Sequence, residues 1–180
     1  MGMATILKKM LIGRAFTTEK GRVKFFGTMD WTLCPSRAFA ITLQKIGEDK
    51  GREYLNELGR IWCEDAAKEM VKAMHLKPKG GWVTQNAIIA LLDFIGWGKM
   101  EFIKSEIKKD GHHHVILHEL DNPVITWAAR LYGPKSVVCE FFMGGYGAHG
   151  EEELGIKNIK LKENKCVCKG APYCEWETKW

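Results

Sequence analysis

The chain has 180 residues, of which 46% are hydrophobic and 27% charged, so it can bury a core as a single globular domain. Its formal net charge of +5 is only mildly basic and gives little support to direct binding of nucleic acid. We expect a cytoplasmic protein without a membrane span, because no segment has the roughly 18 apolar residues of a spanning helix and the first residues show no signal-peptide pattern.

The first part of the chain, up to about residue 110, is predicted to be mainly helical. Its expected elements are a short helix at 5–14, an extended segment at Val23–Trp31, a helix from Pro35 to Gly47, a long amphipathic helix at 48–75 and a further helix at Trp82–Ile95. Pro35 suits the first turn of a helix, and the apolar residues of the last two segments recur at helical spacing. We interpret 1–110 as the helical, dimerisation part of one domain that spans residues 1–180.

The rest of the chain predicts strands around further helical segments. Met100–Lys108 and His112–Leu120 are expected to pair as a hairpin, because Asp110-Gly111 between them is a strong turn signal. Asp121-Asn122-Pro123 predicts a helix start, with an acceptor side chain near the N-cap and proline in the first turn. The last expected strands are Ile156–Glu163, Cys166–Lys169 and Tyr173–Thr178. The chain therefore predicts an α+β fold, with a mostly antiparallel sheet and helices packed on it.

Four of the six cysteines lie near the end of the sequence, at positions 139, 166, 168 and 174. In a reducing compartment, such clustered cysteines indicate metal ligands rather than disulfides. Glu163 is a further candidate, because on its expected strand it shares a face with Ile159 and Leu161, and an inward carboxylate needs a cation or a donor. A two-residue turn at Asn164-Lys165 would place Glu163 opposite Cys166.

Two sets of zinc ligands are compatible with this spacing. Both contain the same three thiolates and they differ in the fourth ligand: Cys139, Cys166 and Cys174 with either Glu163 or Cys168. Thiolate is the softer ligand, which favours Cys168, but spacing alone does not choose between the two sets. Four protein ligands leave no position open for a substrate, so the site would be structural.

The pattern Cys139…Gly144-Gly145-Tyr146…Gly150…Glu163-x-x-Cys166-x7-Cys174, with Gly170-x-Pro172 in the last interval, resembles the 4-vinyl reductase domain family of small hydrocarbon-binding domains. This family includes sensor domains of phenol- and xylene-responsive transcription activators, and it is similar to TRAPP vesicle-tethering subunits. The resemblance implies a ligand-binding domain of the NO-signalling and Golgi-transport type, with a 4-vinyl reductase-like core at about 111–180. It also implies the ligand set Cys139, Glu163, Cys166 and Cys174, with Cys168 as the alternative to Glu163.

Aromatic residues make up 11% of the chain, enough to line an apolar cavity beside the glycine-rich segment Val137–Leu154. The candidate pocket residues are Trp127, Phe142, Tyr146 and His118. No dinucleotide-binding glycine motif follows a predicted strand, and the sequence has no Walker motif and no nucleophile elbow, so we do not expect an enzyme.

The family resemblance, together with the abundance of aromatic residues, implies a zinc-stapled domain that senses a small hydrophobic or aromatic ligand. Its output would be regulatory, through a partner protein or a homodimer, since the sequence carries no ATPase motif of its own. The alternative is a protein–protein interaction scaffold of the vesicle-tethering type. A third hypothesis, an enzyme acting on vinyl or aromatic substrates, lacks a recognisable cofactor site in the sequence.

Overall fold

The computed structural model describes residues 16–19, 22–32, 34–108 and 112–179. Its elements in chain order are β1 (Phe16–Glu19), β2 (Arg22–Phe25), β3 (Met29–Trp31), α2 (Ser36–Lys50), α3 (Arg52–Ala73), α4 (Trp82–Phe94), β4 (Lys99–Ile107), β5 (His113–Asp121), α5 (Pro123–Tyr132), the 3-10 helix η1 (Gly133–Lys135), α6 (Cys139–Leu154), β6 (Lys162–Lys165), the 3-10 helix η2 (Val167–Lys169) and β7 (Cys174–Lys179). The predictions for 5–14 and for the turn at 109–111 lie outside the described residues.

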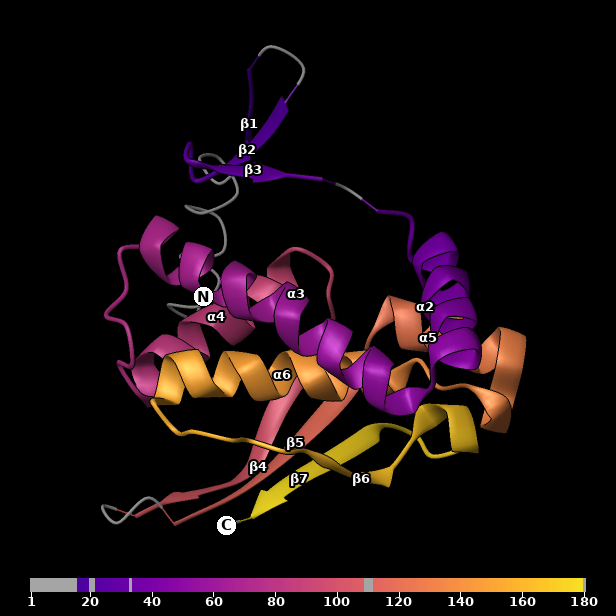
Figure 1. Cartoon of the computed structure of the whole chain (residues 1–180). Coiled ribbons are helices and arrows are strands. Elements are labelled where there is room, and N and C mark those ends of the chain that lie inside the picture. The colour runs from indigo at the N-terminus through magenta and orange to yellow at the C-terminus, as the bar shows by residue number, and fades with distance from the viewer. Residues whose placement is uncertain (1–15, 20–21, 33, 109–111, 180) are drawn as a thin grey trace, which may run out of the picture.

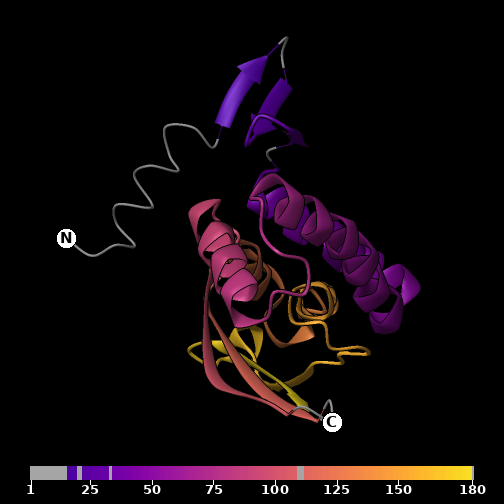
Figure 2. The same cartoon turned by 90° about the vertical axis from the view of Figure 1, so that its left-hand side faces the viewer.

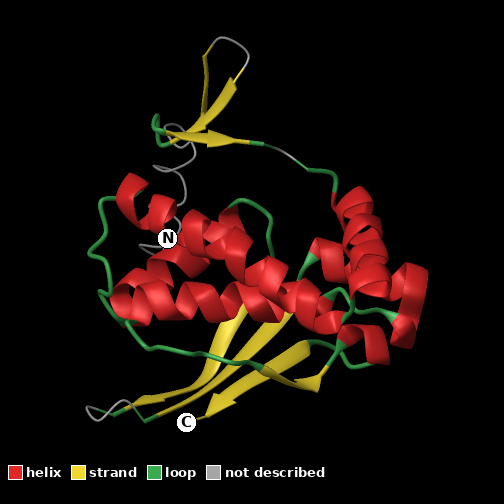
Figure 3. Cartoon of the chain, viewed as in Figure 1, coloured by secondary structure: helices red, strands yellow, loops and turns green. Residues whose placement is uncertain are grey.

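The fold is α+β, as predicted, and its centre is an antiparallel sheet of order β4-β5-β7-β6 covered by helices on one face (Figure 1, Figure 3). Strand β5 alternates between the two faces: Val115 and Leu117 are buried under the helices, while Ile116 and His118 are only partly buried. This alternation decides which side chains of the sheet can reach the interior.

Helices α3 and α6 lie side by side above the sheet, as both views of the molecule show (Figure 1, Figure 2). Their backbones touch at glycines. A Cβ atom at Gly59 would lie 2.0 Å from the Phe141 carbonyl oxygen, and one at Gly144 would lie 1.9 Å from the Asn56 carbonyl oxygen. Only glycine permits so close an approach, so the glycine run of α6 serves the packing of these two helices.

The boundary between α2 and α3 lies at Gly51, and the predicted helix end at Gly47 was wrong. Gly47 lies inside α2, where a Cβ atom would be 2.5 Å from a methyl carbon of Val137, so it serves packing rather than termination. Gly51 has a φ of 94°, which only glycine adopts readily, and this is where the chain turns into α3.

The segment after α6 also differs from the prediction. Most of Ile156–Glu163 is not a strand, and Asn164-Lys165 belongs to strand β6 rather than to a turn. The expected strand at Cys166–Lys169 is instead the 3-10 helix η2, closed by hydrogen bonds from the Lys169 and Ala171 N–H groups to the Cys166 carbonyl. Gly170, with a φ of 90°, supplies the left-handed residue that ends this turn.

A second, smaller antiparallel sheet, β1-β2-β3, lies at the opposite end of the molecule from the four-stranded sheet (Figure 2). It joins the core through Phe25 and Met29, which are buried among residues of the helices. In the described part of the chain, no helix is long and apolar enough to cross a membrane.

Candidate functional site

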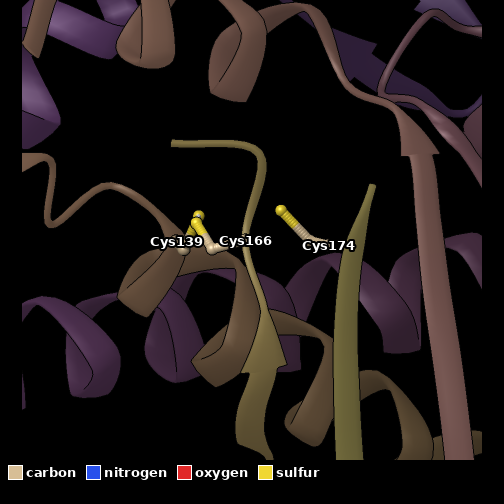
Figure 4. A group of neighbouring side chains, drawn as sticks. All are labelled: Cys139, Cys166 and Cys174. Atoms are coloured by element: carbon tan, nitrogen blue, oxygen red, sulfur yellow. Dashed lines mark hydrogen bonds between the residues drawn. The ribbon is translucent and has the colours of Figure 1, made fainter. Parts of the chain in front are cut away.

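Three buried cysteines from three separate elements meet at one end of α6 (Figure 4). Cys139 is the first residue of α6, Cys166 directly precedes η2, and Cys174 begins β7. Their Sγ atoms all lie within 4.8 Å of one another, and those of Cys139 and Cys166 are 3.4 Å apart. Sulfur atoms that bind one zinc ion at about 2.3 Å in a tetrahedron are roughly 3.8 Å apart, so these three thiols have spacing suited to a metal.

The thiols of this cluster also shift one another's acidity. Hydrogen bonding with Cys139 lowers the pKa of Cys166, and the same interaction raises the pKa of Cys139. The Val167 N–H group donates to Cys174 Sγ at 3.3 Å. Cys174 Sγ therefore has a backbone donor, and a cation bound at the cluster would replace the thiol protons.

The two candidates for a fourth metal ligand, Glu163 and Cys168, lie outside the group of three close thiols. Glu163 accepts a hydrogen bond from Lys169 Nζ, and its pKa is raised, mainly by burial. The Cys168 Sγ lies 3.9 Å from the Ile125 carbonyl oxygen. Hydrogen bonding with Cys139 lowers the pKa of Cys168, but Cys166 and burial outweigh that effect and raise it to about 11. The structure thus brings together three of the predicted ligands and leaves Glu163 and Cys168 beside them.

A cavity of about 320 Å³ lies between the small sheet and helices α2, α3, α4 and α6. Its volume falls in the range of small-molecule sites, roughly 300–1,000 Å³. Seven aromatic side chains share in its lining: Trp31, Phe39, Trp62, Trp97, Phe141, Phe142 and Tyr146. Several of them contact one another edge to face, the arrangement that aromatic rings prefer in an apolar interior. The arrangement suits a small apolar or aromatic ligand.

Two of the four predicted pocket residues line this cavity, and two do not. Phe142 and Tyr146 are part of its wall. Trp127 is absent from the wall and instead packs under the guanidinium groups of Arg37 and Arg130. His118 lies on the sheet face turned away from the helices, where its Nε2 is 2.8 Å from Glu175 Oε2, because strand alternation places it opposite Leu117.

The cavity also has a polar wall that the sequence analysis did not identify. Cys63 of α3 and His149 of α6 both line it, and His149 Nδ1 lies 2.8 Å from Glu153 Oε1. Burial lowers the pKa of His149, but hydrogen bonds with Cys63 and Glu153 outweigh burial and raise it to about 10. The spacing of His149 and Glu153, one helical turn apart, was the available signal in the sequence.

A second buried polar pair connects the cavity to the sheet. The Tyr146 hydroxyl donates to Glu119 Oε2 at 2.7 Å, and Glu119 pairs across the sheet with Cys174. Burial raises the pKa of Glu119 to about 8, so this carboxyl is largely protonated at neutral pH. Glu119 therefore links the two sites, because it bonds to Tyr146 of the cavity wall and lies opposite Cys174 of the cysteine cluster.

Several solved structures share this fold, including the following two. One is the phenol-responsive sensory domain of the transcription activator PoxR with phenol, at a TM-score of 0.66 and 16% identity, covering 99% of this chain and 91% of that one. The other is a trafficking protein particle complex subunit 3 from Naegleria fowleri covalently bound to palmitic acid, at a TM-score of 0.53 and 14% identity, covering 80% and 93%. No family model and no curated protein sequence matches the chain. At these identities the likeness establishes the fold.

Proposed function

We propose that this protein is a sensor domain that binds a small hydrophobic or aromatic molecule in the cavity beside α3 and α6. The observation that carries the proposal is the 320 Å³ cavity with its seven aromatic side chains. The shared fold with a phenol-responsive sensory domain supports the same conclusion. We further propose that the chain belongs to the 4-vinyl reductase domain family and that binding, rather than catalytic turnover, is its task.

We propose that zinc is held at the cysteine cluster by Cys139, Cys166 and Cys174, with Glu163 or Cys168 as the fourth ligand. The three thiols lie at suitable spacing and one of them has a lowered pKa, which fits a metal that binds thiolates. The ion would join α6 to β7 and to the loop before η2. Its role would be to stabilise the fold.

The ligand-binding proposal can be tested by titrating phenol and related small aromatic compounds into the purified protein, with calorimetry and thermal unfolding as readouts. Ala66 of α3 lines the cavity, so Ala66→Leu should fill part of it and weaken binding by about tenfold or more. Ala38→Leu is the matched control, because Ala38 is exposed on α2 and lies outside the cavity wall. Absence of binding by any apolar or aromatic compound, or equal affinity in both variants, would contradict the proposal.

An interaction scaffold is the second candidate function, and one observation favours it. Tyr54, Ile61 and Trp62 of α3 are each more than half exposed, which is unusual for side chains of this kind. We propose that this face serves a homodimer or a partner protein through which ligand binding is reported. Sedimentation of the wild type and of Ile61→Lys tests this: a dimer should dissociate in the variant, and a monomeric wild type that captures no partner contradicts it.

A further inference from the structure

Cys63, His149 and Glu153 form a connected row of side chains on the wall of the aromatic cavity, and ligand binding alone makes no use of it. Glu153 Oε1 holds His149 Nδ1 at 2.8 Å, which leaves Nε2 for the hydrogen bond with the Cys63 thiol. Cys63 and His149 both border the cavity, so a bound molecule would reach the sulfur. A nucleophile beside a base that a third group orients is the arrangement of an activated thiol.

The position of the thiol depends on the packing of α3 against α6. A Cβ atom at Gly145 would lie 2.6 Å from Cys63 Sγ, so glycine at this position leaves the space that the sulfur occupies. His149 is 4% exposed and Glu153 is fully buried, which fixes the imidazole between its two partners. Buried polar groups of this kind are costly unless they pair, and here they pair with one another.

The charge balance around His149 also suits a reactive thiol. Its raised pKa favours the imidazolium form at neutral pH, held by the carboxylate of Glu153 on one side. An imidazolium beside the Cys63 sulfur is placed to donate a proton to a molecule that adds to this sulfur.

We propose that Cys63 is a covalent attachment site for small aromatic α,β-unsaturated carbonyl compounds that enter the aromatic cavity. This inference rests on the proposed ligand-binding function and names a chemical class of ligand for it. The cavity walls supply the preference for an aromatic ring, and the Cys63–His149–Glu153 row supplies the preference for an electrophile. An acyl donor would require a leaving group, whereas a conjugated carbonyl compound reacts with the thiol alone.

The step is a conjugate addition and needs no co-reactant. The Cys63 sulfur forms a bond to the β-carbon of the ligand while the carbon–carbon π bond breaks, and the electron pair moves onto the carbonyl oxygen as an enolate. The proton that left the thiol passes through His149 Nε2 to the α-carbon, which restores the carbonyl group. No atom is lost and no external oxidant or reductant takes part, so the reverse reaction releases the ligand unchanged.

Benzalacetone, an aromatic enone, is the probe for this inference, and its saturated counterpart benzylacetone is the matched non-reactive ligand. Intact-mass spectrometry of the native protein should show one adduct, and peptide mapping should place it on Cys63. Cys34 is the internal control, because it is exposed and borders the same cavity but has no described histidine or carboxylate partner. Cys63 should react faster than Cys34 in the folded protein, and that order should vanish in denaturant.

Two variants test whether His149 activates the Cys63 thiol or whether Cys63 reacts only because the ligand can reach it. Cys63→Ala should abolish the adduct while the protein still binds benzylacetone, and His149→Gln should slow adduct formation by about 100-fold, the usual share of a proton-transferring side chain. Glu153→Gln should slow it less, since Glu153 acts through the imidazole. Adducts on Cys34 alone, or equal rates in wild type and His149→Gln, would overturn the covalent site.

The outcome also distinguishes this inference from the function on which it rests. If benzylacetone binds in the cavity and benzalacetone leaves Cys63 unmodified, the covalent site is wrong and the sensor proposal stands. If neither compound binds, the sensor proposal itself is wrong. Peptide mapping of the wild-type protein needs no variant, so a folding defect in Cys63→Ala does not remove the test.

Discussion

Buried cysteines lie against α6 at two places, and they have different neighbours and therefore different chemistry. At the start of the helix, Cys139 lies against Cys166 and Cys174, and none of these three cysteines lines the aromatic cavity. Further along the same helix, His149 contacts a single thiol, Cys63, beside 320 Å³ of cavity. Burial alone therefore does not decide what a cysteine does: thiols that surround one point suit a cation, and a thiol between an imidazole and open space suits a ligand.

The largest expected effect comes from a substitution that disrupts the cysteine cluster. Cys166→Ser should release the metal and lower the free energy of unfolding by roughly 4 kcal/mol, because a structural ion contributes its binding free energy to folding. Metal analysis and urea unfolding measure both quantities. Cys63→Ser is the matched control and should keep its metal, since Cys63 lies outside the cluster. Unchanged metal content in Cys166→Ser would contradict the assignment.

The next effect should damage the cavity and spare the cluster. Gly144→Ala places a Cβ atom 1.9 Å from the Asn56 backbone oxygen, which cannot move without separating α3 from α6. We expect a loss of about 3 kcal/mol in unfolding free energy, as for overpacked cores, together with weaker ligand binding and unchanged metal content.

Gly150→Ala is the control within the same helix. Its Cβ atom would meet only the terminal methyl group of Ile159, a side chain that can turn away. The unfolding free energy should stay within about 1 kcal/mol of the wild type. Alanine favours the helix by about 1 kcal/mol relative to glycine, and this gain offsets the cost of moving the Ile159 methyl group. Equal losses in Gly144→Ala and Gly150→Ala would show that close backbone contact is not what these glycines provide.

A smaller effect, on the pH dependence of the unfolding free energy, tests the role of Glu119 between the aromatic cavity and the cysteine cluster. Its pKa is raised by burial from 4.5 to about 8, so between these values the folded protein binds a proton that the unfolded chain releases. Stability should therefore fall as pH rises through this window, by at most about 1.4 kcal/mol per pH unit.

Glu119→Gln should flatten this dependence, as measured by urea unfolding at several pH values across the window. Glu101→Gln is the control, because Glu101 is exposed on the neighbouring strand β4. If both variants keep the pH profile of the wild type, the buried carboxyl of Glu119 does not set it.

The smallest expected effect concerns His118, on the outer face of the sheet. His118→Ala removes a partly exposed pair with Glu175 and should cost about 0.5 kcal/mol of unfolding free energy. Ligand affinity and metal content should not change. A tenfold loss of affinity in His118→Ala would place this face of the sheet in the binding site after all.

Much of the fold was predictable because local signals and tertiary structure agree. The N-cap at Asn122 is formed as expected, with its Oδ1 accepting hydrogen bonds from the N–H groups of Val124 and Ile125. The pairing of β4 with β5 agrees with the predicted hairpin. Where the prediction failed, at Gly47 and at Cys166–Lys169, tertiary contacts or a left-handed residue decided the local structure.

The candidate sites were predictable only in part, for a physical reason. Cysteine spacing identified Cys139, Cys166 and Cys174, because short intervals and a turn bring their thiols together. The contact between Cys63 and His149 depends on how α3 crosses α6, and no periodicity in the sequence specifies that crossing. His118 was misplaced because alternation along a strand gives two faces without saying which one is inside.

Trp62 is at once part of the cavity wall and part of the outer surface, with 53% of its area exposed. Its ring packs against Phe39 and Phe141 on the inner side, and Tyr54 and Ile61 are exposed on the same helix. A guest that displaces this ring alters the protein's exterior directly, with no rearrangement of the backbone. Ligand binding in the cavity would therefore change the outer surface that a partner protein contacts, and it would also change the fluorescence of Trp62.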